Sequence, residues 1–271
     1  MASLVASTSR VIDRLERSEM SRARALETTL TVAKSCCAED PEADKFATWE
    51  AWVTAMQVGS ALFVSATAAE GPVPCRIGVD GEVKNLPATG PQFYLNPGSW
   101  LTSWYLATIC RDNARLDQLA SVPVSFLRES GTMFDEYIYD WVEALQNFWR
   151  GRAEAMWDKI VAAVDGTDPN VARSASTELL LKILYPPLEL FHLYQRREVE
   201  RFNETLTNAL TWHKEYWTGD AERCDNTDGL VALAPLALAC MARDASFPIT
   251  VESEYLPKEL LEFGWAGEVD T

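Results

Sequence analysis

The chain contains only two histidines, and one of them has the spacing of a metal ligand. Glu189 and His192 are three residues apart, so on a helix both side chains would lie on one face, as the ligands of di-iron carboxylate bundles do. Such a site needs two Glu-x-x-His pairs, but the other histidine, His213, has Leu210 at the corresponding position. His213 also lies on the apolar face of its predicted helix. We therefore expect no metal site at these positions.

Magnesium-dependent isoprenoid cyclisation is a second chemistry to consider, because those enzymes are all-helical and lined by aromatic residues. The nearest metal-binding pattern is Asn203-Glu204-x-x-Thr207, but Thr211 stands where a further carboxylate is required, and no Asp-Asp-x-x-Asp motif is present. The motifs G-x-S-x-G, G-x-x-x-x-G-K-[ST] and H-E-x-x-H are also missing from the sequence. We therefore predict no catalytic residue and no cofactor.

The six cysteines do not suggest chemistry either. None belongs to a C-x-x-C pair, and Cys36 and Cys37 are adjacent, which suits ordinary disulfide bonds poorly. Cys110 and Cys240 lie in apolar helical patterns, where a thiol packs as a small hydrophobic group. We expect reduced thiols.

Helical periodicity dominates the elements that would position any site. Apolar residues repeat at three- and four-residue intervals in segments 49–63, 134–149, 156–164 and 199–217, and segment 229–242 is apolar throughout. The stripe in segment 134–149 predicts that Trp141 is buried against the core. The sequence predicts an all-α fold, an array of about ten antiparallel helices that resembles helical-repeat proteins.

Boundary residues divide these helices. Asp40-Pro41, Asn96-Pro97 and Asp168-Pro169 each place a capping side chain before a proline, which suits the first position of a helix. Pro186-Pro187 should separate two helices, and Gly151 should end another. We treat residues 1–271 as a single domain that begins with an N-terminal helical segment, 1–38.

One segment, residues 75–84, breaks the helical pattern. Short runs of β-type residues lie on either side of Asp80-Gly81, a pair that supplies the positive φ angles of a type I′ turn. Prolines and glycines flank the segment. A small β-hairpin inserted between helices is predicted there.

The charge limits the classes of partner. Twenty-four basic and 40 acidic residues give a net charge of −16, which disfavours binding to nucleic acid and to anionic membranes. It suits a basic protein partner, because long-range attraction speeds association. Neither a signal peptide nor a stretch long enough to span a bilayer is apparent. A cytoplasmic protein is therefore expected.

The excess of acidic residues is concentrated near the C-terminus. Residues 219–271 hold 3 basic and 11 acidic residues, half of the net charge in the last fifth of the chain. Glu252, Glu254 and Tyr255 form an anionic stretch with an aromatic anchor, a composition common at interfaces. They are our candidate partner-binding residues. Alternatively, Tyr255, Leu256 and Pro257 only lock the tail onto the last helix, and the hairpin around Asp80-Gly81 is the next candidate surface.

Several stretches together resemble immunity protein family 49 of bacterial polymorphic toxin systems. The segments are WEAWVTAMQ (49–57), GSWL (98–101), ATICR (107–111), GLVAL through Ala239-Cys240 (229–240) and ESEYLP with Leu260-Leu261 (252–261). The resemblance spans about residues 45–262. It implies an all-α protein that neutralises a cognate toxin domain by binding it, and it supplies no catalytic residues. A helical-repeat scaffold for protein–protein interaction is the alternative hypothesis, and an all-α enzyme with an unrecognised site is the third.

Overall fold

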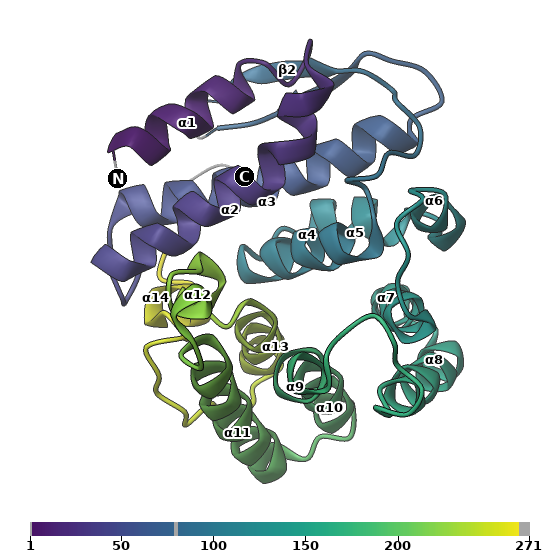
Figure 1. Cartoon of the computed structure of the whole chain (residues 1–271), viewed down its shortest axis with the longest axis vertical. Coiled ribbons are helices and arrows are strands. Elements are labelled where there is room, and N and C mark those ends of the chain that lie inside the picture. Colours follow the sequence, from purple (N-terminus) through teal and green to yellow (C-terminus); the bar gives the residue numbers. More distant parts are fainter. Residues whose placement is uncertain (1, 79–80, 266–271) are drawn as a thin grey trace.

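The computed structural model describes residues 2–78 and 81–265. Helices make up most of it, so the predicted all-α class is confirmed, and so is the single hairpin (Figure 1). In the described part, the helices of eight or more residues are α1 (Ala2–Ile12), α2 (Glu19–Glu39), α3 (Phe46–Thr67), α4 (Pro97–Ile109), α5 (Asn113–Ala120), α7 (Glu136–Trp149), α8 (Ala153–Gly166), α10 (Pro186–Gln195), α11 (Val199–Trp217) and α13 (Leu233–Asp244).

Shorter helical segments connect them. The α-helical ones are α6 (Val124–Arg128), α9 (Thr177–Leu179), α12 (Ala221–Cys224) and α14 (Lys258–Glu262). A π-helical turn, η1 (Leu180–Leu184), leads into Pro186 at the start of α10, and a 3-10 turn, η2 (Thr227–Leu230), precedes α13. Pro186-Pro187 therefore divides two helices as predicted, because a proline at the first helical position has no N–H that needs a partner.

One of the three predicted Asx-Pro helix starts is confirmed. The side chain of Asn96 accepts a hydrogen bond from the Ser99 N–H at 3.0 Å, and Pro97 opens α4. Gly151 also ends α7 as predicted, in the left-handed region at φ +68°, which a residue without a Cβ adopts at little cost.

The other two predicted starts are wrong. Asp40 ends α2 instead, and its carboxylate accepts hydrogen bonds from the Lys45 N–H and the Thr48 hydroxyl. Asp168 opens a tight turn, in which the Val171 N–H donates to its carbonyl at 2.7 Å. An aspartate side chain stabilises turns as well as helix N-termini. An Asp-Pro pair therefore indicates that one element ends there, but it does not determine whether a helix or a turn follows.

The hairpin consists of β1 (Val73–Arg76) and β2 (Val83–Leu86), paired antiparallel with Arg76 opposite Val83. A two-residue turn at Asp80-Gly81 would place Val79 opposite Glu82, but the N–H that bonds the Glu82 carbonyl is that of Ile77, at 3.0 Å. The predicted turn position is therefore wrong, although residues 79 and 80 themselves lie outside the described residues. The hairpin packs on α3, where the side chain of Gln57 accepts from the Gly78 N–H at 2.7 Å.

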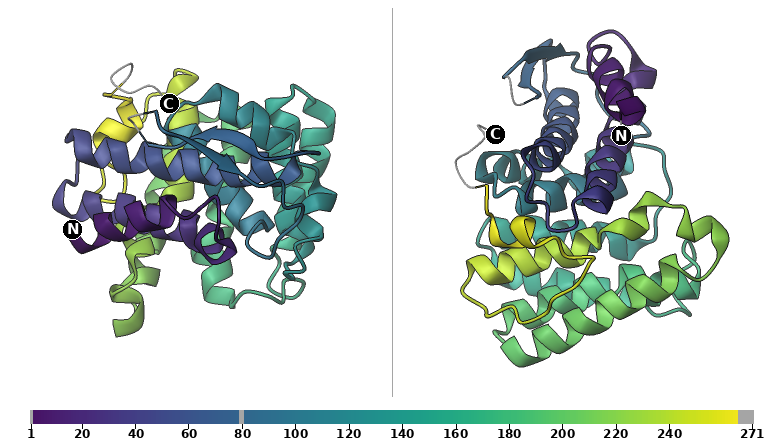
Figure 2. Two further views of the ribbon diagram at one scale, coloured as in Figure 1. Left: turned by 90° about the horizontal axis from the view of Figure 1, so that it is seen from above. Right: turned by 90° about the vertical axis from the view of Figure 1, so that its left-hand side faces the viewer.

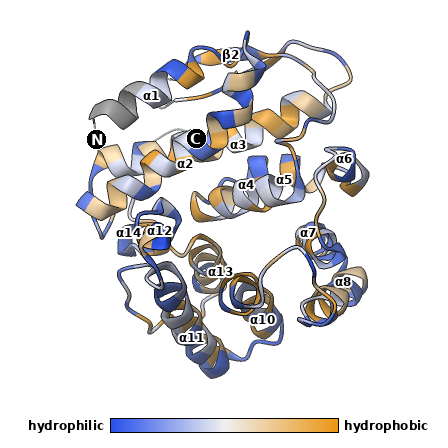
Figure 3. Ribbon diagram, in the orientation of Figure 1, coloured by the Kyte–Doolittle hydropathy of each residue, from blue (hydrophilic) through white to orange (hydrophobic). Residues whose placement is uncertain are grey.

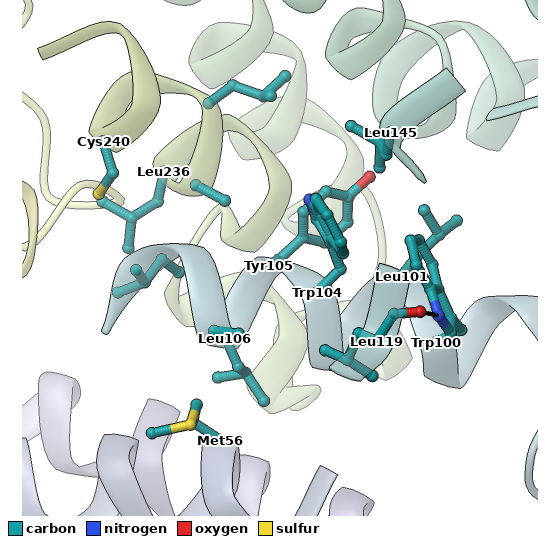
Figure 4. Packing of buried hydrophobic residues seen from close by; sticks show 14 of the residues in the cluster. Met56, Trp100, Leu101, Trp104, Tyr105, Leu106, Leu119, Leu145, Leu236 and Cys240 are labelled. Carbon is teal, nitrogen blue, oxygen red and sulfur yellow. Dashed lines mark hydrogen bonds between the residues drawn. The ribbon is translucent and has the colours of Figure 1, made fainter. Parts of the chain in front are cut away.

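A single cluster of buried hydrophobic residues extends from Leu15 to Leu261, with α4 at its centre. Figure 4 shows Trp100, Trp104 and Tyr105 along α4, with Met56 of α3 on one side of that helix and Leu236 of α13 on the other. The stripe predicted for segment 134–149 faces this core, and Trp141 is 2% exposed, as expected.

The predicted apolar helix in segment 229–242 is α13. It packs against α4, α10 and α11, so the last long helix returns to the middle of the molecule (Figures 1 and 2). Figure 3 shows hydrophobic colour on α13 and hydrophilic colour on the peripheral α12. Within the described residues, no helix combines the length and apolarity that crossing a membrane requires.

Candidate partner-binding groove

The structure places two of the three candidate partner-binding residues, Glu254 and Tyr255, on the wall of one groove of about 350 Å³. The third, Glu252, is exposed and does not line it. The ends of α2, α11, α12 and η2 converge here, at the side of the molecule where α12 and α14 are seen in Figure 1. The lining residues are Cys37, Ala38, Pro41, Trp217, Thr218, Arg223, Cys224, Asn226, Gly229, Leu230, Glu254 and Tyr255.

The aromatic side chains of the groove rest on a buried histidine. The ring of His213 is 5.0 Å from that of Tyr255 and 6.2 Å from that of Trp217, measured between centroids. Its Nε2 lies 3.1 Å from the carbonyl oxygen of Gly229, which can only accept, so Nε2 carries the proton. Burial lowers the pKa of His213 to about 4, which keeps the ring neutral at physiological pH.

Tyr255 serves the fold as well as the groove. Its backbone carbonyl accepts a hydrogen bond from the Ala232 N–H at 3.1 Å, and the next residue, Leu256, is buried. The tail is therefore locked beside the start of α13, as the alternative interpretation proposed. The phenol itself is only half-buried and lines the groove. Burial, and then the negative charge of Glu254, raise the pKa of Tyr255 to about 12, so the phenol stays protonated.

The charges around the groove are mostly negative. Arg223 is the cation among the lining residues, but Glu178 at 3.0 Å and Asp220 at 2.8 Å neutralise it. Exposed acidic residues adjoin the lining residues along the chain: Glu39, Glu42, Glu222, Asp225 and Asp228. Aromatic lining residues beside an exposed carboxylate, Glu254, in an acidic stretch of chain favour a partner that offers basic side chains.

The wall formed by α2 is joined to η2 through an ion pair. The ammonium of Lys34, which is buried, lies 2.7 Å from the carboxylate of Asp228. Three residues further along α2, the sulfur of Cys37 accepts a hydrogen bond from the indole N–H of Trp52 at 3.4 Å. Burial raises the pKa of the Cys37 thiol to about 12, so it is un-ionised and unreactive. Cys224 is the exposed cysteine of the six, all of which are free thiols.

The sequence did not indicate most of this groove. Trp217 ends the apolar stripe of segment 199–217, a position that predicts a core residue, but it is only half-buried and its remaining surface lines the groove. Cys37 and Ala38 are about 180 residues away along the chain. A local pattern carries no information about such a pairing.

The residues considered for metal chemistry have other contacts. The ring of His192 packs edge-on against Trp157 with centroids 5.5 Å apart, and the side chain of Asn203 bonds the loop residues Pro248 and Thr250. In residues 2–78 and 81–265, no group of three or more His, Cys, Asp or Glu side chains is placed to hold a metal ion.

A second hollow, of about 380 Å³, lies beside the hairpin and is lined by residues that include Glu16, Pro72 and Asn85. Its described lining residues include no aromatic side chain. Since aromatic anchors dominate interface energetics, this site is the weaker candidate for binding a protein.

Comparison with known protein families gives a match over most of the chain. The family model described as immunity protein 49 matches residues 40–260, which include all of the groove except Cys37 and Ala38. No curated protein and no solved structure matches the chain.

Proposed function

The chain belongs to the immunity protein 49 family, and from this premise we propose that it neutralises a cognate bacterial toxin domain by binding it directly. The toxin domain would be the effector part of a polymorphic toxin system, and binding would take place in the cytoplasm of the cell to be protected. Neutralisation of this kind needs complementary surfaces rather than catalytic residues. We accordingly propose a binding protein and not an enzyme.

The groove is the observation that supports the proposal most directly. It combines half-buried aromatic side chains, Trp217 and Tyr255, with an exposed carboxylate, Glu254, and exposed acidic residues adjoin its lining residues along the chain. Interfaces are typically strongest where an aromatic anchor is surrounded by polar groups that exclude water. Of the two described hollows, this one has that composition.

The charge supports a basic toxin. A toxin that acts on nucleic acid needs basic side chains to hold phosphates. An acidic protein of net charge −16 would be attracted to that same surface and could cover it. Such binding would block the substrate without any chemical change to the toxin.

Growth rescue tests the proposal. The toxin domain encoded beside this chain should arrest growth when it is expressed alone, and co-expression of this protein should restore growth. Glu254→Lys should weaken the rescue, whereas Glu129→Lys should not. Glu129 is also an exposed acid, but it follows α6 on the opposite side of the molecule in Figure 1. Absence of rescue by the wild-type chain would contradict the proposal and favour the helical-scaffold hypothesis.

A further inference from the structure

The groove offers two kinds of contact to a ligand. Trp217, Tyr255 and Leu230 supply apolar and aromatic surface, and Glu254 supplies a carboxylate at the same opening. The complementary ligand has a long apolar stem and a cationic end. Among protein side chains, lysine and arginine have that form.

Glu254 already has a cationic neighbour within the chain. The ammonium of Lys214, on α11, lies 3.3 Å from its carboxylate, and the two side chains are 61% and 64% exposed. Exposed pairs of this kind contribute little to stability, because water competes for both charges. Lys214 can therefore release Glu254 to a ligand that binds it with better geometry.

Another lining residue, Arg223, shows how a guanidinium binds to the aromatic and acidic side chains of this region. The guanidinium of Arg223 lies 4.3 Å from the centroid of the Tyr216 ring and pairs with Glu178 and Asp220. It also donates to the carbonyl of Tyr216 at 3.2 Å. A planar guanidinium makes such stacked and forked contacts simultaneously, whereas an ammonium is a point charge.

We propose that the groove holds one arginine side chain of the partner protein, with its guanidinium on Glu254 in place of Lys214 and its stem on Trp217 and Tyr255. This inference rests on the proposed function, because it names the group by which the partner is recognised at the same groove. Arginine is also among the residues that most often act as hot spots in interfaces.

The experiment uses the full chain and a small probe. The indole N–H signal of Trp217 is identified by its loss in Trp217→Phe, and the ¹⁵N-labelled protein is titrated with N-acetyl-arginine amide. A saturable shift of that signal is expected. N-acetyl-citrulline amide has nearly the same shape without the charge and should cause no comparable shift. N-acetyl-lysine amide should bind more weakly than the arginine probe.

Three variants separate the roles. Glu254→Gln should weaken arginine binding by roughly tenfold, as expected for loss of a charge-assisted pair. Lys214→Ala should strengthen it by roughly two- to fivefold, because the internal competitor is removed. Glu129→Gln is the matched control and should leave it unchanged. All three positions are exposed, so folding should be preserved.

The inference is overturned if the arginine probe does not shift Trp217, if citrulline shifts it equally, or if Glu254→Gln binds arginine like the wild type. Unchanged or weaker arginine binding by Lys214→Ala would contradict the claim that the arginine displaces Lys214 from Glu254. Growth rescue without arginine binding would refute this inference and leave the immunity proposal standing. Arginine binding without growth rescue would support this inference and contradict the immunity proposal.

Discussion

The imidazole of His213 packs against the phenol ring of Tyr255, with centroids 5.0 Å apart and planes inclined at 58°. The histidine is 5% exposed and belongs to the core face of α11, whereas the tyrosine belongs to the C-terminal tail and lines the groove. The hydrophobic core therefore supports a lining residue of the groove directly. A change in the charge of His213 should affect both the hydrophobic core and the groove.

Acid should destabilise the protein through His213. Burial lowers its folded-state pKa to about 4, against about 6.5 in the unfolded chain; the hydrogen bond to the Gly229 carbonyl opposes this shift, Lys34 adds to it and Asp228 opposes it. Between these pH values the unfolded state binds more protons, so the stabilising contribution is complete above pH 6.5 and is lost as the pH falls towards 4. The loss should be on the order of 3 kcal/mol in the free energy of unfolding.

Denaturant unfolding at pH 7.0, 5.5 and 4.5 measures this effect. Carboxylates also titrate at the acid end of the range, so the useful quantity is the difference between the wild type and His213→Gln, which cannot titrate at this position. The wild type should lose more stability on acidification than the variant. Parallel pH profiles would show that His213 is not the group responsible.

Trp141 should be among the most costly residues to truncate. It is 2% exposed, its indole N–H donates to the Tyr105 hydroxyl at 2.8 Å, and its ring lies 5.1 Å from that of Phe191. Trp141→Ala should lower the free energy of unfolding by about 3–5 kcal/mol through lost burial and a residual cavity. Tyr105→Phe, which leaves the indole N–H without its partner, should cost about 1–3 kcal/mol.

Thermal and denaturant unfolding of both variants test this prediction, with Met133→Ala as the control. Met133 is 91% exposed, so its truncation should change stability by less than about 0.5 kcal/mol. An unchanged melting temperature in Trp141→Ala would mean that the ring is not packed as described.

The helices could be predicted because their evidence is local. The stripe through Tyr137, Trp141 and Leu145 repeats at helical intervals within one segment, so neither its existence nor its buried side depends on the rest of the fold. The central position of α13 could not be predicted in this way. An apolar segment such as 229–242 must be buried, but its composition does not say that α4 is the helix that buries it.

The groove was predictable only in part, for the same reason. Glu254 and Tyr255 are adjacent and stand out by composition, but their neighbour Trp217 looks like one more core residue at the end of a stripe. Its exposure depends on where α11 ends relative to α2 and α12. Glu252 and Glu254 are both exposed acidic residues of the same stretch, and residue type does not determine that Glu254 alone of the two lines the groove.

Arg111 should hold the C-terminal segment in place. Its backbone is left-handed at φ +53°, and its guanidinium donates to the carbonyls of Leu260 and Leu261 at 2.7 and 2.8 Å and pairs with Asp244 at 3.0 Å. Arg111→Ala would remove these donors from the carbonyls of Leu260 and Leu261 and from that of Ile109, and a loss of about 2–4 kcal/mol in unfolding free energy is expected.

Hydrogen exchange would show where the Arg111→Ala effect falls. Amides in α14 and α13 should lose protection before those in α7, because Arg111 links α4 to the C-terminal segment. Asp244→Asn is a milder comparison, since the side chain of Asp244 is 50% exposed and exposed charges contribute little. Equal loss of protection throughout the chain would mean that Arg111 stabilises the whole fold and does not specifically hold the C-terminal segment.

Reversing the charge of Glu252 and Glu254 to Lys should weaken binding to the toxin domain. Both residues are exposed, so the free energy of unfolding should change by less than about 1 kcal/mol. The positive charges would repel a basic partner during approach, which slows association and reduces its dependence on salt. Surface plasmon resonance at two ionic strengths measures both rates, and Glu129→Lys with Asp158→Lys supplies a control of equal charge on the α6 and α8 side.

The two single variants should change different rate constants, because Glu254 lines the groove and Glu252 does not. Glu252→Lys should act at long range and lower the association rate alone. Glu254→Lys should also raise the dissociation rate, since a charge inside an interface is felt after contact is made. Two identical kinetic profiles would mean that the groove is not the contact surface. Unchanged affinity in the folded double variant would move the interface away from the C-terminal tail, and the surface around the hairpin of β1 and β2 would be tested next.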